Sequence, residues 1–198
     1  MSLRYVLPLY LLAYFVAAFF WCSFIVWKKT SINPVVFKGT DNAHDFIGRA
    51  FKLLFVLIAI VVLVYSFWPG LYHYAVPIEW LEHVRLKWLG VAFLLLSLLW
   101  TVLAQAQMGE SWRIGIDQEH RTSLVRRGVF GLSRNPIFLG MMLTLLGFFL
   151  VVPNALTLLS FVLGVVLIQI QVRLEEEFLA RTHGEEYEQY RRQVRRWI

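Results

Sequence analysis

Charged residues are scarce in this sequence: 19 Lys and Arg and 13 Asp and Glu make up 16% of its 198 residues. Soluble proteins average about a quarter charged residues, whereas hydrophobic residues reach 59% here. This scarcity excludes an ordinary soluble domain and indicates an integral membrane protein, with one domain expected at this length. Cysteine is nearly absent as well, and the single Cys22 excludes an internal disulfide.

Metal-ligand spacings such as H-E-x-x-H are missing too. His73 and Glu82 lie in a loop between apolar segments, where interfacial roles are expected. His44 and Asp45 precede another apolar segment, where a helix cap is expected rather than a metal site. The sequence therefore predicts no bound metal.

Five apolar segments approach the length of about 20 residues that a helix needs to span a bilayer. They cover 7–27, 50–68, 86–104, 136–152 and 155–172. Only Pro153 and Asn154 separate the last two, which predicts a tight helical hairpin. Because both helices of such a hairpin just cross the bilayer, residues near 134–140 and 170–177 should lie at one depth and touch.

The basic residues predict the orientation in the membrane. Five lie in 28–52, five in 105–135 and six in the tail from Arg173, which leaves three for the other side. The positive-inside rule then predicts an extracytoplasmic N-terminus, with the C-terminus and the active site in the cytoplasm. Anionic lipid headgroups account for the pI of 9.7, so no nucleic-acid partner is needed.

Residues suited to chemistry gather on the predicted cytoplasmic side. The hairpin brings Arg134 and Asn135 opposite Arg173 and the acidic triplet Glu175, Glu176 and Glu177. Charged groups near the hydrocarbon boundary are costly and by default indicate a functional site. Three glutamates near a helix C-terminus also oppose the helix dipole, which a cationic ligand would offset. The open alternative is an ion-pair cluster that merely ends the helix.

The C-terminal segment predicts a basic amphipathic helix at the membrane surface. His183 and Gly184 interrupt the preceding helix, and Thr182 with Glu185 fits a capping box. The apolar residues of the new helix recur at helical spacing: Tyr187, Tyr190, Val194 and Trp197. This helix either lies on the bilayer or closes a pocket over the hairpin.

Taken in order, these motifs resemble the isoprenylcysteine carboxyl methyltransferase family, its prokaryotic members in particular, and related phospholipid methyltransferases. R-[HN]-P-x-[YF]-x-G is matched by residues 134–140, E-E-x-x-L by 175–179, and G-x-x-Y-x-x-Y-x-x-x-V-x-R-[WF] by 184–197. The resemblance covers about residues 105–198.

The resemblance and the apolar segments together imply an all-α integral membrane protein with about five transmembrane helices. The last two form the tight hairpin, and a C-terminal amphipathic helix follows. Residues 1–104 would supply three transmembrane helices. Residues 105–198 would supply a cofactor-binding loop, the hairpin and the interfacial helix, all within one integrated domain.

The resemblance further implies an S-adenosylmethionine-dependent methyltransferase that leaves S-adenosylhomocysteine as product. Its acceptor would be a lipophilic small molecule or lipidated compound that enters from the bilayer, with the carboxylate of a prenylcysteine-like molecule as the methylated group. The sequence lacks a glycine-rich turn after a strand, which excludes the common soluble methyltransferase fold.

The resemblance also implies the cofactor-binding residues. The glutamates would offset the sulfonium charge, donors around the Arg-Asn pair would bind the methionyl carboxylate, and two phenylalanines would contact adenine and ribose. The expected set is Thr122, Ser123, Leu124, Val125, Phe130, Arg134, Asn135, Pro136, Phe138, Gly140, Glu175 and Glu176.

Two residues are the candidates for catalysis. Arg173 would orient the acceptor carboxylate through bidentate hydrogen bonds. Glu177, four residues on and therefore on the same helix face, would fix Arg173 or abut the cofactor. Three alternatives stay open: a phospholipid N-methyltransferase in which a glutamate takes the proton, a membrane NADPH-dependent reductase of the sterol type, and a non-enzymatic scaffold.

Overall fold

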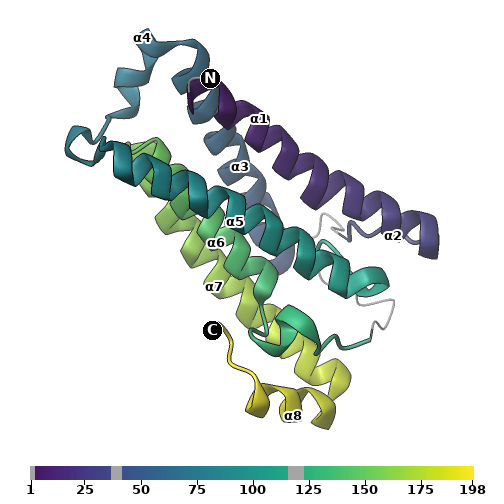
Figure 1. The fold of residues 1–198 in the computed structure, drawn as a ribbon. Helices are drawn as coiled ribbons and strands as arrows, with labels where there is room; N and C mark the ends of the chain where they lie inside the picture. Colours follow the sequence, from purple (N-terminus) through teal and green to yellow (C-terminus); the bar gives the residue numbers. More distant parts are fainter. Residues whose placement is uncertain (1–2, 37–41, 116–122) are drawn as a thin grey trace.

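A computed structural model describes residues 3–36, 42–115 and 123–198, and these residues form a bundle of long helices (Figure 1). The long and C-terminal helices are α1 (Leu3–Phe15), α2 (Cys22–Thr30), α3 (Ala43–Phe67), α5 (Val84–Met108), α6 (Pro136–Val151), α7 (Ala155–His183) and α8 (Glu185–Gln193). A π-helical turn, η1 (Val16–Trp21), joins α1 to α2. Short helical turns complete the chain: α4 (Pro69–Tyr72), η2 (His73–Ala75), η3 (Glu79–Leu81), η4 (Gly109–Ser111) and η5 (Gly128–Gly131).

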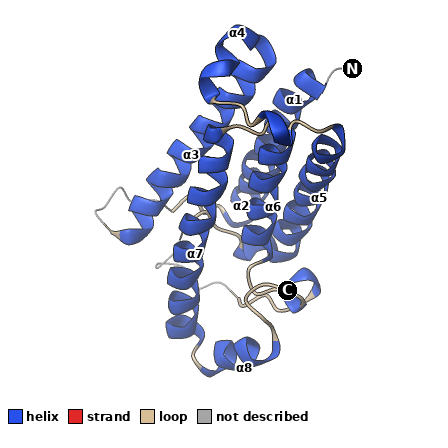
Figure 2. Cartoon of the chain, turned by 90° about the vertical axis from the view of Figure 1, so that its left-hand side faces the viewer, coloured by secondary structure: helices blue, strands red, loops and turns tan. Residues whose placement is uncertain are grey.

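Within these described ranges, four helical stretches are long and apolar enough to cross a membrane: Leu3–Thr30, Ala43–Phe67, Val84–Ser111 and Ala155–His183. A fifth apolar helix, α6, is 16 residues long. The described residues contain no strand (Figure 2). These findings confirm the predicted all-α membrane fold and place a helix on each of the five apolar segments.

The predicted hairpin is confirmed. The α6 helix ends at Val151 and α7 begins at Ala155. The Asn154 side chain caps α7 by accepting a hydrogen bond from the Thr157 amide at 2.9 Å. The tip is held from outside, because the Ile78 amide donates to the Pro153 carbonyl at 2.9 Å.

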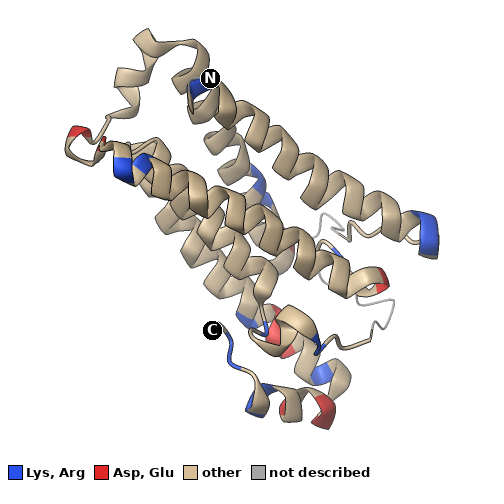
Figure 3. Ribbon diagram, viewed as in Figure 1, with Lys and Arg blue, Asp and Glu red and all other residues tan. Residues whose placement is uncertain are grey.

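Lys, Arg, Asp and Glu residues lie mainly toward the two ends of the bundle (Figure 3). At one end, the Arg4 side chain donates to the Tyr65 carbonyl beside the N-terminus. At the other end lies α8, and there the Ile114 amide donates to the Pro34 carbonyl at 2.8 Å. The segment after α2, the segment after α5 and the C-terminus therefore share this end, as the alternation of basic segments predicts. We refer to it as the α8 end.

The junction between α7 and α8 differs from the prediction. The α7 helix continues through Thr182, and the break falls at Gly184, whose φ of +54° favours glycine. The predicted capping box is wrong, because Gly184 itself is the N-cap and has no side chain. The last helix also ends early, at Gln193, so Val194 and Trp197 lie beyond it.

Glycines bring α5 and α6 into close contact. A Cβ atom on Gly90 of α5 would lie 2.8 Å from the Gly147 carbonyl of α6 and 2.7 Å from Val151 Cγ2. Small residues at such crossings let the backbones of membrane helices approach closely. A Cβ on Gly140 of α6 would likewise clash with Thr101 Oγ1 of α5.

We expect Gly90→Ala to destabilise the bundle by about 1–3 kcal/mol, since the added methyl overpacks a backbone contact. Thermal unfolding in detergent measures this as a lower midpoint. Gly70→Ala is the matched control, because a Cβ there meets nothing within 4 Å. Equal midpoints for the two variants would show that α5 and α6 can separate without cost.

Candidate functional site

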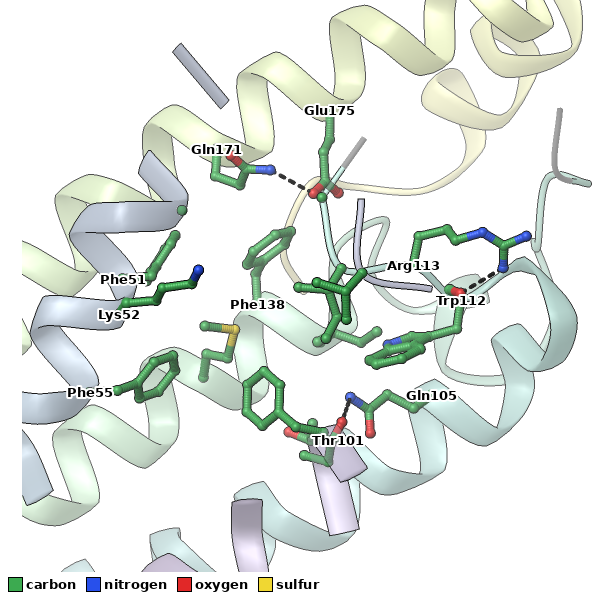
Figure 4. Close-up of a pocket in the computed structure, with 18 of the residues that line it drawn as sticks. Phe51, Lys52, Phe55, Thr101, Gln105, Trp112, Arg113, Phe138, Gln171 and Glu175 are labelled. Carbon is green, nitrogen blue, oxygen red and sulfur yellow. Dashed lines mark hydrogen bonds between the residues drawn. The ribbon is translucent and has the colours of Figure 1, made fainter. Parts of the chain in front are cut away.

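A cavity of about 390 Å³ lies inside the bundle toward the α8 end (Figure 4). Its volume falls in the range of small-molecule binding sites. Its walls come from five helical elements and from the two segments that pair at Ile114: α1 with η1, α3, α5, α6, α7, and residues around Val35 and Trp112.

One side of the cavity is aromatic. The ring centroids of Phe15 and Phe19 lie 5.4 Å apart, and both approach the Phe55 ring, at 5.5 and 5.8 Å. A smaller cavity of about 20 Å³ shares Phe15 and Phe55 with it and extends toward Phe148. The apolar side therefore continues into the hydrophobic core.

The other side of the cavity is polar. The Glu175 carboxylate accepts a hydrogen bond from Gln171 Nε2 at 2.9 Å, and both side chains come from α7. Lys52 from α3 and Arg113 from the segment after α5 also line the cavity, Lys52 between Phe51 and Phe55 and Arg113 on the opposite side of the view (Figure 4). Arg113 Nη1 donates to the Glu110 and Trp112 carbonyls, each at 2.8 Å, which fixes the guanidinium at the rim. A carboxyl group and two basic side chains thus line one cavity.

Helix geometry separates the three glutamates of the triplet. Successive residues on a helix point about 100° apart. Glu175 lines the cavity, Glu176 is buried in a network with two arginines, and Glu177 is exposed and pairs with Arg181. Among the three, Glu175 is therefore the carboxylate placed to meet a ligand in this cavity.

Glu176 is fixed by three side chains. Arg134 Nη2 and Asn135 Nδ2 each donate to its Oε1 atom at 3.0 Å. Arg196 Nη2 donates to Oε2 at 2.8 Å. Hydrogen bonding to the Glu176 carboxylate raises the pKa of the Arg196 guanidinium above its usual value. The Glu176 and Arg134 side chains are each only 9% exposed. The predicted contact between 134–140 and 170–177 is confirmed at these atoms.

The residues after α8, 194–198, form a C-terminal strap that the start of the hairpin holds. The Arg134 amide donates to the Arg195 carbonyl at 2.9 Å, and Arg134 Nη1 donates to the Val194 carbonyl at 2.7 Å. Ser133 Oγ donates to the Arg196 carbonyl at 3.1 Å. These backbone partners explain why the chain leaves the helix at Gln193, since the carbonyls of the strap serve Ser133 and Arg134 instead.

Arg173 does not join this cluster. Its Nη1 donates to the carbonyl and the side-chain Oε1 of Gln169, one turn earlier on α7, and the side chain is exposed. The expected pairing of Arg173 with Glu177 is wrong, because Glu177 pairs with Arg181. Each of these partners lies four residues away along α7, so the spacing alone did not distinguish them.

Among the residues expected to bind cofactor, Phe138 and Glu175 line the cavity. Phe130 is buried against Ala104, and its carbonyl accepts from the Tyr190 hydroxyl at 2.7 Å. Pro136 starts α6, and its carbonyl accepts from the Trp100 side chain.

The expected cofactor loop lies away from the cavity where it is described. Ser123 is exposed and bonds to Ser111 at 3.0 Å, and Leu124 is half-buried. Val125 packs on the small cluster around Ala104. Thr122 lies outside the described residues.

Several cavity residues were not predicted from the sequence, notably His44, Lys52, Thr101, Gln105 and Arg113. Thr101 and Gln105 offered a signal, since two polar residues one turn apart interrupt an otherwise apolar membrane segment. Within the described ranges, no three His, Cys, Asp or Glu residues are grouped so that they could hold a metal ion.

We expect Glu176→Gln to lower stability by about 2–4 kcal/mol, because it leaves buried Arg134 without its counter-charge. Thermal unfolding and carboxypeptidase release of the strap would both report the loss. Glu177→Gln is the matched control, since its exposed pair with Arg181 contributes less than about 1 kcal/mol. A stable Glu176→Gln variant with a protected C-terminus would contradict the role of the network.

Comparison with known proteins gives one family. The phospholipid methyltransferase family model matches residues 86–186, from α5 to the start of α8 and so about half of the chain. No curated protein and no solved structure matches the chain significantly. The match confirms the expected kinship at the level of membrane methyltransferases, and it does not single out the isoprenylcysteine branch. The chain therefore belongs to the phospholipid methyltransferase family.

Proposed function

We propose that the protein transfers a methyl group from S-adenosylmethionine to the carboxylate of a lipophilic acceptor inside the 390 Å³ cavity. The observation that carries this proposal is the set of ionisable side chains in its lining: the Glu175 carboxyl group on one helix, and the basic side chains of Lys52 and Arg113 on other elements. A sulfonium and a carboxylate are the two charged groups that such a reaction brings together.

Glu175 fits the sulfonium of the cofactor. The side chain lines the cavity and is oriented by Gln171. In a site of low dielectric, an oriented carboxylate stabilises a nearby cation more strongly than it would in water. Phe138, from the facing helix, supplies an apolar ring beside it. When bound, S-adenosylmethionine supplies the methyl group.

Arg134 and Asn135 then have a supporting role. They hold Glu176, the neighbour of Glu175 in the sequence, and thereby fix the α7 turn that presents Glu175 to the cavity. Asn135 makes this contact through its amide, so no proton transfer is needed at this position. Arg134 and Asn135 were expected to bind the cofactor directly. We propose instead that they position Glu175, which binds it.

Lys52 and Arg113 fit the carboxylate of the acceptor. An ionised carboxylate needs no general base, so alignment and charge complementarity are the tasks of the site. Arg113 is held by two carbonyls at the rim, and a guanidinium can bind a carboxylate in a bidentate manner. Two cations at the site disfavour the amine of a phospholipid headgroup, so N-methylation is the second candidate.

The aromatic side fits the apolar part of the acceptor. Phe15, Phe19 and Phe55 line this side, and the smaller cavity beyond them is apolar. A prenylcysteine-like molecule has this combination of a carboxylate and a long hydrocarbon chain. By the positive-inside rule, the α8 end and the reaction would face the cytoplasm.

We expect Glu175→Gln to weaken S-adenosylmethionine binding by about tenfold or more, which corresponds to about 1.4 kcal/mol. S-adenosylhomocysteine, which has no positive charge, should lose less. Isothermal calorimetry of both ligands in detergent separates the effect of the lost charge on affinity from the effect of an altered cavity shape.

Glu177→Gln is the control for this measurement, since Glu177 lies outside the cavity and pairs with Arg181. Equal losses for both ligands would remove the sulfonium argument. The absence of any binding to the wild-type protein, together with binding of NADPH, would replace the proposal with the reductase alternative.

We expect Arg113→Ala to reduce kcat/KM for methyl transfer to a lipid carboxylate by about tenfold to a hundredfold, as the loss of a charge-assisted pair implies. Arg173→Ala is the comparison, because Arg173 bonds to Gln169 on the exposed side of α7. The reverse result, a loss with Arg173→Ala alone, would favour the residue expected from sequence.

A further inference from the structure

Among the described residues that line the cavity, three buried polar atoms lack hydrogen-bond partners: His44 Nδ1, Thr101 Oγ1 and Gln105 Oε1. The last two belong to residues one turn apart on α5 (Figure 4). Thr101 is 1% exposed and Gln105 is 4% exposed. Buried polar groups in proteins are nearly always paired, so each exception requires an explanation.

The neighbouring polar residue on the same helix face shows the usual behaviour. Ser97 lies one turn before Thr101 and is also buried. Its hydroxyl donates to the Leu94 carbonyl at 2.8 Å and accepts from Thr144 Oγ1 at 2.9 Å. Ser97, which does not line the cavity, is therefore fully hydrogen-bonded, whereas Thr101 Oγ1 and Gln105 Oε1, whose residues line it, have no partner.

The Gln105 side chain is held in place. Its Nε2 atom donates to the Ala18 carbonyl in the π-helical turn η1 at 2.8 Å. Because a carbonyl can only accept, the amide orientation is fixed, and Oε1 is the atom left for another donor. Such π-helical turns occur frequently at functional sites. Gln105 is thus a preorganised acceptor in the cavity wall.

Thr101 Oγ1 stands beside it, one helical turn away and against Gly140, which leaves room for it. The Tyr14 phenol also lines the cavity close to Thr101, but no hydrogen bond of normal geometry joins the two. Thr101 can donate its hydroxyl hydrogen or accept another. The pair therefore offers one fixed acceptor and one adaptable hydroxyl.

We infer that Thr101 and Gln105 form a specificity subsite for a hydroxyl group carried on the apolar chain of the acceptor. One hydroxyl oxygen can donate to Gln105 Oε1 and accept from Thr101 Oγ1, so a single atom satisfies both. A secondary amide fits less well, since its N–H and C=O point in opposite directions in the trans form. This inference rests on the proposed lipid-binding role of the cavity.

The position of the subsite favours a hydroxyl group part-way along the hydrocarbon chain of the acceptor. Thr101 and Gln105 lie across the cavity from Glu175 (Figure 4). The aromatic side, with Phe15, Phe19 and Phe55, lines the same cavity. A ligand with its charged end at the polar side and its hydroxyl at the α5 pair would thus lay the rest of its chain along the aromatic side.

The test is competition binding on the purified full-length protein in detergent, with tritiated stearate as tracer. The competitors are hydroxystearates with the hydroxyl at successive chain positions, and unlabelled stearate is the reference. We expect one position to bind about tenfold more tightly than stearate. Thr101→Val and Gln105→Met should bring that ratio close to one, and Thr101→Ser should restore it.

Ser160→Ala is the matched control, because Ser160 is a buried membrane hydroxyl that bonds to the Leu156 carbonyl away from the cavity. This variant should keep the wild-type ratio. Thr101→Val preserves the shape of the side chain and removes no hydrogen bond present in the structure, so the fold should tolerate it.

Three results would overturn the inference. The first is an equal affinity of the wild-type protein for every hydroxystearate and for stearate, as expected if a water molecule or Tyr14 satisfies the pair. The second is a preference that survives in both Thr101→Val and Gln105→Met. The third is a fall in S-adenosylhomocysteine affinity in these variants while the lipid ratio stays constant, which would assign the pair to the cofactor. No methyl donor is present in the competition assay. A hydroxyl preference can therefore be observed even if the protein transfers no methyl group, and methyl transfer can be observed even if the protein shows no hydroxyl preference.

Discussion

The Glu176 carboxylate is the contact on which the α8 end of this protein depends. It receives hydrogen bonds from Arg134 and Asn135 at the start of the hairpin and from Arg196 in the strap. Three segments far apart in the sequence thus meet at one buried anion. A buried ion pair costs desolvation energy, and this cost is offset only when the remaining polar atoms are also satisfied. The backbone carbonyls of the strap meet that need for Arg134.

This network has a consequence for the cavity. Fixing Glu176 sets the rotation of α7 about its axis, and that rotation directs Glu175 into the cavity and Glu177 toward the exterior. A structural ion pair and a carboxyl group that lines the cavity are therefore adjacent in the sequence. The ion-pair cluster predicted as one alternative is found at Glu176, and the proposed functional role falls to its neighbour Glu175.

The cavity itself arises from uneven helix packing. Glycines let α5 and α6 pack closely. On the side of α1, η1 and α3, large aromatic side chains line the cavity instead. The family match begins at residue 86, so Phe15, Phe19, Lys52 and Phe55 lie outside it. One wall of the cavity thus comes from the matched segment and the other from the preceding helices.

The sequence by itself determined the membrane class, the five apolar helices and the tight hairpin, because length and hydropathy decide whether a segment can cross a bilayer. It also determined that Arg134 and Asn135 meet the acidic triplet, since a hairpin places its two ends at one depth. Only the tertiary structure decided which glutamate faces the cavity, that Arg173 bonds back to Gln169, and that the strap leaves the helix after Gln193. These outcomes depend on the rotation of each helix about its axis and on partners distant in the sequence. Local spacing cannot decide between partners when a side chain has more than one acceptable neighbour. Lys52 and Arg113 became candidates for the same reason, because packing brings α3 and the segment after α5 to one cavity.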